Sequence, residues 1–455
     1  MLQDKLSFTI LFLILPLKVV QLQIRNNQIQ TGKIMALVFK FGGASLKDAD
    51  SVRNMADIVA SFSDNIIIVV SAMGKTTKAL HKLATGYFYR DESAKDIEEF
   101  WAYHNEIIEN LGIKSEPELM DRLNWIKEYL IQKLSQKPSE SFDFEYDQIV
   151  CIGELISSVI VNQYLKKCNI KNQWIDIRQS LKTDNVYRDS RINWEISEDL
   201  VLKNFDFSKD RIFLTQGFIA SDQDNNSTTL GLEGSDYTAA ALAYFINAEK
   251  MVVWKDVAGF FNSDPNEFEN VVKLDAISYR EAVELAYYGA KIIHPKTIKP
   301  LENKNIPLWV KSFKEPDQEG TVITLSTHDK SGVVPMVPVY ITKNSQILIS
   351  IAPNDFSFIA EYNLEHIFSI LARYRIRVNL MQNSAISFSV CVDYDEEKII
   401  PAIRELNNAY KVLFNKDLTL VTIRHFNEEI VKQIVAGKEV LVQQKSRNMI
   451  RLVVR

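Results

Sequence analysis

The segment Lys40-Phe41-Gly42-Gly43-Ala44-Ser45 holds the residue types best suited to phosphoryl chemistry, and it directly follows a short apolar run. Two adjacent glycines allow backbone N–H groups to approach a phosphate with no side chain in between. A lysine at the end of the preceding strand supplies positive charge for a transferring phosphoryl group. The pattern is compatible with a phosphate site, but a Gly-Gly turn alone is more typical of an ordinary strand-to-helix turn.

Four later segments carry polar residues that such a site needs. Glu154 follows Gly153 at an expected helix start, where a carboxylate binds a substrate ammonium group or simply complements the helix dipole. Residues 228–237 form a polar, glycine-bearing segment that leads into a Ser-Asp helix cap, an arrangement that binds anions. Residues 254–265 follow an apolar strand and could hold the base and sugar of a nucleotide, and Lys291 lies just beyond a helix end. Nine of the 15 glycines (42, 43, 74, 153, 217, 231, 234, 259 and 289) fall in or near these segments, which together predict one composite phosphate site.

Three other classes of nucleotide-binding protein are excluded by their motifs. Gly74-Lys75-Thr76 is similar to the end of a P-loop, but the position that needs the loop glycine holds Val69. The sequence contains no HRD-like and DFG-like pair, which excludes the protein kinases. It also contains no G-x-G-x-x-G, which excludes a dinucleotide-binding Rossmann domain.

Length, composition and net charge exclude further classes of protein. A chain of 455 residues predicts two to four domains at about 100–200 residues each. Hydrophobic residues make up 46% and charged residues 24%, which is ordinary for a globular protein. The formal net charge of −5 gives no electrostatic reason to bind nucleic acid. The three cysteines are too few and too scattered for a disulfide framework or a cysteine-rich zinc site, so we expect a reducing, cytoplasmic location.

Residues 1–34 are interpreted as an upstream extension, with the functional fold beginning at Met35. The apolar run Ile10–Leu15 is too short to span a membrane, which takes about 20 apolar residues. No small-x-small cleavage site follows it, as a secretory signal would require. A signal anchor and a disordered tail are the alternative interpretations, and no membrane association of the rest of the chain is expected.

The elements that must position these residues alternate between strands and helices. Apolar, β-rich segments predict strands, and residues at three- and four-residue spacing predict helices from Asp48, from Thr76 and throughout 94–135. Ser278, with Glu281 three residues later, predicts a capping box and a helix over 279–288. The predicted strands are 36–40, 65–70, 147–152, 211–214 and 251–254. This alternation indicates a parallel sheet with helices on both faces and ligands at the carboxyl ends of its strands.

A polar linker that contains proline and glycine, at 314–320, separates this region from a C-terminal tail in which strands and helices follow a different order. The tail reads as one βαββαβ unit followed by βαββ, and the segment 337–342 can supply the strand that the second unit lacks. We therefore expect two interleaved copies of one small α+β module. The expected tail strands are 346–351, 378–382, 386–392, 410–414, 419–424, 439–444 and 449–454, and the helices 358–374, 396–407 and 428–435.

Six motifs in this order resemble the aspartate kinases, and the resemblance spans 35–455. They are 40–45, 71–74, 153–154, 231–237, 254–265 and 289–295. The resemblance implies a three-layer amino-acid-kinase domain with a mostly parallel central sheet, followed by tandem interleaved ACT domains. The expected boundaries are 1–34 for the extension, 35–312 for the catalytic domain, 313–336 for the linker and 337–455 for the ACT domains.

The resemblance also implies the reaction and the residues that serve it. ATP phosphorylates the side-chain carboxylate of L-aspartate to give 4-phospho-L-aspartate, the first step toward lysine, threonine and methionine. A carboxylate is already ionised, so no general base is needed and catalysis is positioning plus charge neutralisation, with Mg²⁺ accompanying ATP. No residue is assigned as a metal ligand. The implied catalytic residues are Lys40 and Asp236; those for substrate are Ser71, Thr76, Glu154, Gly234 and Ser235; those for ATP are Gly42, Gly43, Lys255, Asp256, Phe261, Lys291 and Ile292; those for an effector are Val378, Asn379 and Ser384.

Three positions depart from the family pattern. Leu232 stands where an arginine usually binds a substrate carboxylate, and losing such a pair costs roughly 1.5–3 kcal/mol, or about 10- to 150-fold. The expected outcomes are weak aspartate binding, an altered substrate, or compensation by Arg188 or Arg191. Phe261 replaces a common tyrosine, and Asn266 stands where an arginine often reaches the ATP phosphates, a charge that Lys255 could replace.

Two other functions are weighed against an active aspartate kinase. A catalytically weakened homologue, kept as an amino-acid sensor or partner subunit, is favoured by Leu232 but opposed by the retained Lys40, Glu154, Asp236 and Lys291. Another amino-acid kinase, such as a glutamate kinase, is disfavoured by the paired ACT modules. The resemblance further implies a homodimer through the ACT domains. Asn379 stands where lysine-sensing relatives tend to carry an acidic residue, so lysine, threonine and no effector all stay open.

Overall fold

The computed structural model describes residues 35–90, 96–265, 267–268, 271–290, 292–325, 337–355 and 357–455. The expected extension at 1–34, together with Asn266 and Lys291, lies outside these residues. Contacts divide the chain into two compact units, Met1–Val257 with Lys296–Glu319 and Ala258–Pro295 with Gly320–Arg455. Residues 258–295 thus group with the C-terminal unit, whereas the sequence analysis placed them in the catalytic domain, and the expected domain boundaries stay a prediction.

The first unit is built on six parallel strands in the order β11-β7-β1-β2-β4-β3. The central strands are buried along their whole length, which explains their continuous apolar sequences. The predicted parallel sheet is therefore confirmed. The strands are β1 (Ala36–Phe41), β2 (Asn65–Val70), β3 (Gln173–Ile175), β4 (Ile212–Gln216), β7 (Lys250–Lys255) and β11 (Leu308–Ser312), and a small hairpin follows β4 as β5 (Ile219–Ser221) and β6 (Ser227–Thr229).

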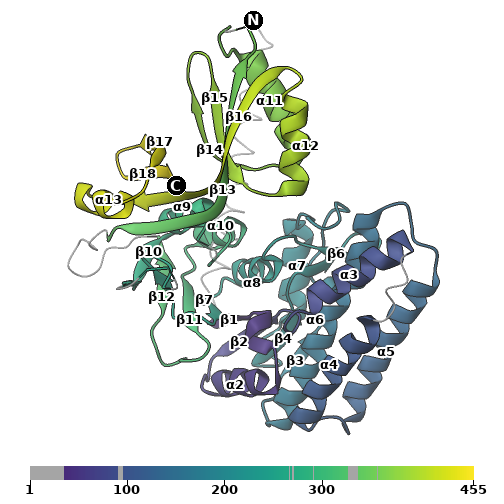
Figure 1. Cartoon of the computed structure of the whole chain (residues 1–455). Coiled ribbons are helices and arrows are strands. Elements are labelled where there is room, and N and C mark those ends of the chain that lie inside the picture. Colours follow the sequence, from purple (N-terminus) through teal and green to yellow (C-terminus); the bar gives the residue numbers. More distant parts are fainter. Residues whose placement is uncertain are drawn as a thin grey trace, which may run out of the picture. The chain divides into compact units, whose positions relative to one another are not determined.

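Helices pack against this sheet as the alternating pattern requires (Figure 1). Helix α6 contacts β2, β3 and β4, whereas α8 contacts β1, β2 and β7. Asp48 caps α2 by accepting a hydrogen bond from Ser51 N–H at 2.8 Å, as expected. The helices are α2 (Ala49–Ala60), α3 (Thr76–Tyr89), α4 (Asp96–Leu111), α5 (Pro117–Ser135), α6 (Phe142–Lys167), α7 (Trp194–Asn204), α8 (Gly234–Phe245) and α10 (Pro295–Lys304), with 3-10 turns η1 (Gly43–Leu46) and η3 (Ile177–Gln179).

The helical stretch expected over 94–135 is two helices rather than one. Helix α4 ends at Leu111, and Gly112 then adopts φ of +64°, a left-handed conformation that terminates helices. Helix α5 begins at Pro117, a residue favoured at the first helical position. Gly112 and Pro117 mark this break in the sequence, but the apolar helical segments on both sides of it were interpreted as one stretch.

The strand predicted at 147–152 is wrong, because these residues lie inside α6. A short run of β-branched residues does not distinguish a buried strand from a buried helix, and here the packing on all sides favours the helix. Glu154 therefore lies in the middle of a buried helix and not at a helix start. Among the described helices, α6 alone is long and apolar enough to cross a membrane, but 94% of its most apolar window is buried in the structure, as in a core helix.

The close approach of α8 to the end of β4 depends on Gly217. A Cβ atom on this glycine would lie 2.5 Å from Ser235 Cβ and 2.7 Å from Ser235 Cα. Its N–H donates to Val70 O at 2.8 Å, which keeps the turn after β4 beside the end of β2. The absence of a side chain at this position therefore allows the first turn of α8 to reach the carboxyl edge of the sheet.

In the second unit, helix α9 (Tyr279–Tyr288) has the predicted bounds and ends at Gly289. Ser278 Oγ accepts from Glu281 N–H at 3.0 Å, so half of the predicted capping box forms. The Glu281 carboxylate instead binds the Arg424 guanidinium through two hydrogen bonds of 2.7 and 2.8 Å. The short strands of this unit are β8 (Phe260–Phe261), β9 (Lys273–Leu274), β10 (Ala276–Ser278) and β12 (Thr321–Thr324).

The tail forms one antiparallel six-stranded sheet in the order β14-β15-β13-β16-β18-β17. Two strands are longer than expected: β13 covers both 337–342 and 346–351, and β16 covers both 410–414 and 419–424. Each passes through both α+β modules, so the predicted interleaving is confirmed. The elements are β13 (Val339–Pro353), α11 (Glu361–Arg373), β14 (Val378–Asn383), β15 (Phe388–Asp393), α12 (Glu396–Leu406), β16 (Tyr410–Arg424), α13 (Glu428–Val435), β17 (Val440–Lys445) and β18 (Met449–Val454).

We expect Gly217→Ala to lower the free energy of unfolding by about 1–3 kcal/mol, because the added methyl overpacks the contact with Ser235. Urea denaturation followed by circular dichroism measures the change. The control is Leu202→Ala on the exposed side of α7, where a shift within about 0.5 kcal/mol is expected. Equal stability of the Gly217→Ala variant and the wild type would contradict the close approach.

Candidate active site

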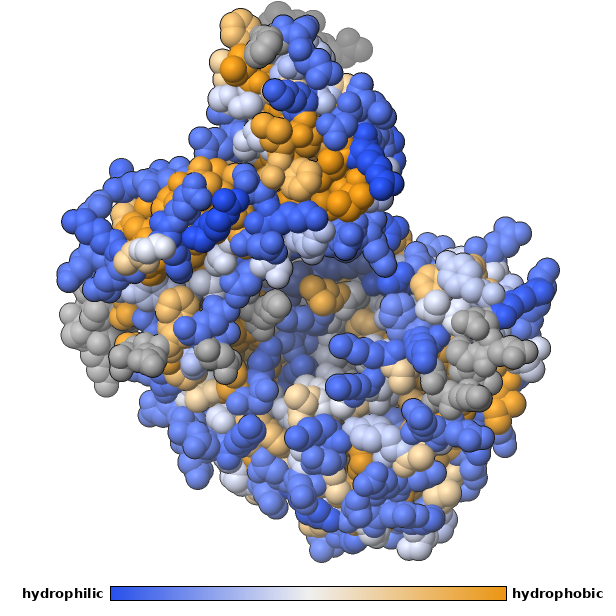
Figure 2. Space-filling view, in the orientation of Figure 1, coloured by the Kyte–Doolittle hydropathy of each residue, from blue (hydrophilic) through white to orange (hydrophobic). Residues whose placement is uncertain are grey.

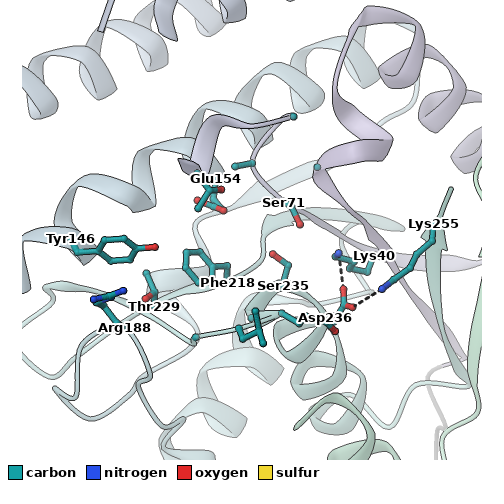
Figure 3. A pocket seen from close by; sticks show the side chains of 18 residues that line it. Lys40, Ser71, Tyr146, Glu154, Arg188, Phe218, Thr229, Ser235, Asp236 and Lys255 are labelled. Carbon is teal, nitrogen blue, oxygen red and sulfur yellow. Dashed lines mark ion pairs between the residues drawn. The ribbon is translucent and has the colours of Figure 1, made fainter. Parts of the chain in front are cut away.

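A cavity of about 520 Å³ opens at the carboxyl ends of β1, β2, β4 and β7, beside the first turn of α8. This is the position at which parallel α/β sheets bind their ligands. The structure brings together eight of the residues predicted from sequence, Lys40, Gly43, Ser71, Glu154, Gly234, Ser235, Asp236 and Lys255 (Figure 3). The rest of the lining is Ala72, Gly74, Thr77, Tyr146, Arg188, Phe218, Thr229, Gly231, Leu232 and Glu233.

One end of the cavity is a charged cluster centred on Asp236. Lys40 Nζ lies 2.6 Å from Asp236 Oδ1, and Lys255 Nζ lies 3.7 Å from Oδ2 (Figure 3). Burial raises the pKa of Asp236, but the two ammonium groups outweigh burial and hold this pKa below its usual value. The cluster therefore carries two cations and one carboxylate, a net positive charge suited to an anionic phosphate.

The glycine-bearing loops after β1 and β2 are held against each other. Gly74 N–H donates to Gly43 O at 3.0 Å, and a Cβ on Gly43 would lie 2.6 Å from Ala72 O. A Cβ on Gly42 would lie 3.3 Å from Lys40 Nζ, so a side chain there would crowd the ammonium group. The Ser71 carbonyl accepts from Ser157 Oγ at 2.7 Å, which fixes the second loop on α6. The predicted Gly-Gly turn is therefore a tight junction of two loops beside the charged cluster.

Glu154 reaches the cavity from the middle of α6, and the residue is only 2% exposed. Its Oε2 atom is buried without a hydrogen-bond partner among the described residues. Burial raises the pKa of Glu154 to about 8, although backbone N–H groups of Glu154 and Ala72 act in the opposite direction. A buried carboxyl group with an unsatisfied oxygen favours a cationic ligand that supplies the missing hydrogen bond.

The opposite end of the cavity is formed by Arg188 and Tyr146 (Figure 3). The guanidinium carbon of Arg188 lies 4.6 Å from the Tyr146 ring centroid, within the range of a cation–π contact. Arg188 N–H donates to Asp147 Oδ2 at 3.0 Å, and the same carboxylate accepts from Thr229 N–H at 2.8 Å and Thr229 Oγ1 at 2.7 Å. Burial raises the pKa of Asp147 to about 6, against these hydrogen bonds. Asp147 thus anchors two loops to α6.

The N-cap of helix α8 lies two residues before the predicted cap at Ser235. This residue is Glu233, with φ of +53°, and Ser235 and Asp236 lie in the first turn. The reason is the tight turn at Gly231, whose carbonyl accepts from Gly234 N–H at 3.0 Å. Asp236 in this first turn is favoured by the helix dipole, and the turn delivers it to Lys40. Leu232, immediately before the cap, is 75% exposed in the lining of the cavity.

Several predicted residues lie elsewhere. Thr76 is buried with its Oγ1 3.3 Å from His104 Nε2, and its neighbour Thr77 lines the cavity instead. Asp256 is exposed in the loop after β7. Phe261 in β8 and Ile292 in a turn belong to the second unit, and Lys291 lies outside the described residues. The assignment of Asp256, Phe261, Lys291 and Ile292 to ATP therefore stays a prediction.

Thr77, Tyr146 and Phe218 line the cavity but were not predicted from the sequence. Phe218 had a detectable signal, because it follows Gly217 at the carboxyl end of β4, the same edge that holds the other loops. Tyr146 had none once 147–152 was interpreted as a strand, since α6 alone places it beside the cavity.

The residues assigned to an effector lie on or just after the edge strand β14. Val378 and Asn379 belong to the strand, and Ser384 follows its end. Asn379 Nδ2 donates to Gln346 Oε1 at 2.9 Å and to Asp393 Oδ1 at 3.0 Å. Its Oδ1 accepts from Lys343 Nζ at 3.0 Å. Asn379 is therefore the centre of a polar network across β13, β14 and β15.

The chain is similar in sequence to the amino acid kinase family and to aspartokinases from bacteria and plants. Residues 35–312 match the model of the amino acid kinase family. The lysine-sensitive aspartokinase 3 of Escherichia coli is 30% identical over 426 residues, which cover 89% of this chain and 90% of that protein. The chloroplastic aspartokinase 2 of Arabidopsis thaliana is 28% identical, covering 84% of this chain and 71% of its own length.

Solved structures show the same relationship. The crystal structure of Escherichia coli aspartokinase III in complex with lysine and aspartate superposes with a TM-score of 0.80 at 25% identity, covering 92% of this chain and 95% of that one. The structure of the same bacterial enzyme with aspartate and ADP gives a TM-score of 0.75. The aspartate kinase of Clostridium acetobutylicum, 22% identical with a TM-score of 0.74, shows the shared fold.

The raised pKa of Glu154 predicts a pH-dependent stability. The carboxyl group loses its proton near its ordinary pKa of 4.5 in the unfolded chain and near 8 in the folded protein. Between these values the unfolded chain binds fewer protons, so rising pH favours unfolding by up to about 1.4 kcal/mol per pH unit. We expect Glu154→Gln to remove this loss between pH 4.5 and 8.

Urea denaturation at several pH values between these limits measures the difference between the wild type and Glu154→Gln. Exchange of the exposed Glu140 for glutamine is the matched control. A wild type whose stability follows the same pH profile as Glu154→Gln would show that Glu154 ionises normally in the folded protein.

Proposed function

The chain belongs to the amino acid kinase family and, within it, to the aspartokinases, and from this we propose that it transfers the γ-phosphoryl group of ATP to the side-chain carboxylate of L-aspartate. The product is 4-phospho-L-aspartate, an acyl phosphate. The observation that carries the proposal is the cluster of Lys40 and Lys255 on the buried Asp236, beside two glycine loops at the carboxyl edge of a parallel sheet.

The cluster is arranged to receive an anion. Asp236 holds both ammonium groups in place before substrate arrives, so little reorganisation is needed at the moment of transfer. An incoming phosphoryl group competes with Asp236 for Lys40 and offers the stronger negative charge. The backbone at Gly43 and at the first turn of α8 adds N–H donors beside it. Charge on the transferring group is thus neutralised without any proton transfer.

The acceptor needs orientation and no activation. The β-carboxylate of aspartate is ionised at neutral pH, so it attacks phosphorus directly and the leaving group departs as ADP. Glu154 accepts a hydrogen bond from the substrate ammonium group, for which its buried Oε2 has a free position. Ser71 and Ser235 line the space between Glu154 and the lysines, where the acceptor carboxylate must lie (Figure 3).

We propose that Mg²⁺ enters with ATP. The described residues contain no group of three or more His, Cys, Asp and Glu side chains that could hold a metal ion. Mg²⁺ is commonly held by one or two carboxylates together with substrate phosphates, and Asp236, the buried carboxylate of the charged cluster, is suited to contribute one. The ion supplies neutralisation of the phosphate charge when bound.

The weakened-homologue alternative rests on Leu232. It is not favoured, because the charged cluster and Glu154 are intact in one cavity. Leu232→Arg separates the two possibilities directly. If the wild type forms no product and the variant does, Leu232 has disabled a kinase.

We propose that the C-terminal unit binds an amino acid effector at β14 and pairs with a second copy of the chain. Lysine is the first candidate effector, because one similar structure is a complex with lysine. Large apolar side chains stay exposed in this unit, among them Met381, Leu413 and Phe414. Figure 2 shows hydrophobic surface gathered over the same unit. The three free cysteines support a reducing, cytoplasmic location.

Phosphoryl transfer is tested by trapping the acyl phosphate with hydroxylamine in the presence of L-aspartate and MgATP, alongside ADP release. We expect hydroxamate from the wild type at millimolar aspartate. Lys40→Met should lower kcat by about 100- to 1,000-fold, because one preorganised cation on the transferring group is lost. Lys47→Met, in the same loop but exposed, is the control and should retain activity. Full activity of Lys40→Met would refute the assigned role.

The dimer is tested by light scattering on the eluted protein. Leu413 is 62% exposed, and a glutamate buried in its place within an apolar interface would lack a partner. We expect a dimeric wild type and a monomeric Leu413→Glu. Leu202→Glu, on an exposed face of the first unit, should remain dimeric. A monomeric wild type would reject the pairing.

A further inference from the structure

The charges that line the cavity are unevenly distributed. Lys40 and Lys255 meet at Asp236, and the remaining described cation in the lining, Arg188, lies at the other end beside Tyr146 (Figure 3). Glu154 lies between the two ends. A ligand that fills the cavity therefore meets two separate positive regions with a carboxyl group between them.

L-aspartate matches this distribution, and the inference rests on the proposed function. Its β-carboxylate must lie at the lysine end, where the phosphoryl group is transferred. Its α-carboxylate then points away from the lysines, and a carboxylate removed from water without a cation is strongly disfavoured. We propose that Arg188 binds the α-carboxylate of the substrate and thereby selects amino acids with a free carboxylate at that position.

The guanidinium of Arg188 is held in place and still has donors to offer. Phe142 and Tyr146 place their rings 5.5 and 4.6 Å from it. One of its N–H groups donates to Asp143 at 3.0 Å, and both side chains of this pair are more than a third exposed, at 39% and 56%. Such an exposed ion pair is weak, whereas a guanidinium has five N–H donors and binds a carboxylate through two at once.

The backbone of Arg188 is constrained at a conformational cost. Its φ of +68° lies in the left-handed region, which is unfavourable for a residue other than glycine. The Asp147 carboxylate holds its N–H, and a Cβ on Gly231 would lie 3.3 Å from the Arg188 carbonyl oxygen. The packing therefore presses Arg188 against the loop that carries Leu232, and both side chains line one cavity.

Leu232 lines the same cavity and offers no polar group, so Arg188 supplies the charge that the loop itself lacks. Arg191, the other arginine weighed from the sequence, is exposed and is not part of the described cavity lining. The structure thus separates two arginines that lie three positions apart in the chain.

The experiment measures L-aspartate binding to the full chain by calorimetry, without turnover, so it does not depend on catalysis. We expect Arg188→Met to weaken binding about 10- to 150-fold, the range for a lost hydrogen bond to a charged group. Arg191→Met is the matched control and should bind as the wild type does. Aspartic acid α-amide, which lacks the α-carboxylate, should bind the wild type and Arg188→Met equally weakly.

A second variant guards against a merely structural effect. Arg188→Met combined with Leu232→Arg places a guanidinium on the adjoining loop and should recover most of the lost affinity. Three results would each overturn the proposal. The first is equal aspartate affinity of the wild type and Arg188→Met, and the second is no measurable aspartate binding by the wild type. The third is an Arg188→Met variant that loses as much affinity for the α-amide as it loses for aspartate. Hydroxamate formation is measured in parallel: a wild type that binds aspartate through Arg188 but forms no hydroxamate contradicts the kinase function and leaves the carboxylate site standing.

Discussion

The buried carboxylate of Asp236 is the interaction on which the candidate active site depends. It is 2% exposed and lies between ammonium groups that arrive from β1 and β7, while its own backbone belongs to α8. None of the three charges is stable there alone, because an unpaired ion out of water costs several kcal/mol. Pairing of Asp236 with the two lysines offsets this cost and leaves one excess positive charge facing the cavity. The fold thus holds the lysine side chains in position for the substrate by pairing them with Asp236 before the substrate binds.

The rest of the first unit places recognition groups at fixed distances from that cluster. Helix α6 carries Tyr146 and Asp147 near one end of the cavity and Glu154 near its middle. Tyr146 and Glu154 are eight positions apart in this helix, which corresponds to about 12 Å along its axis. Because α6 is buried on all sides, this spacing is rigid. A single core helix therefore fixes the distance from Glu154 to the end of the cavity that holds Tyr146.

Sequence reasoning worked where a local pattern had one physical interpretation. Lys40 and the two glycines after β1, the helix that starts from Asp48 and the capped helix 279–288 are local features, and the structure has them as expected. Glu154 was placed in the cavity for the wrong reason, because a buried helix and a buried strand look alike in an apolar run. Arg188 and Arg191 were equal candidates from the sequence, because the choice between them depends on how Asp147 joins two distant loops. The expected strands ended at 342 and 414, yet β13 and β16 continue beyond these positions with shifts in register.

The interleaving of the two tail modules determines the order in which they can fold during synthesis. The first half of β13 pairs with residues 420–424, and β16 in turn pairs with 449–454. During synthesis the ribosome therefore releases β13 long before its partners exist, and the intervening 346–414 module can close first around its own core. The remaining strand segment must wait in an unpaired state for roughly 80 residues, or several seconds at about 5–20 residues per second. Vectorial folding of this unit is thus nested, with the inner module completed before the outer one.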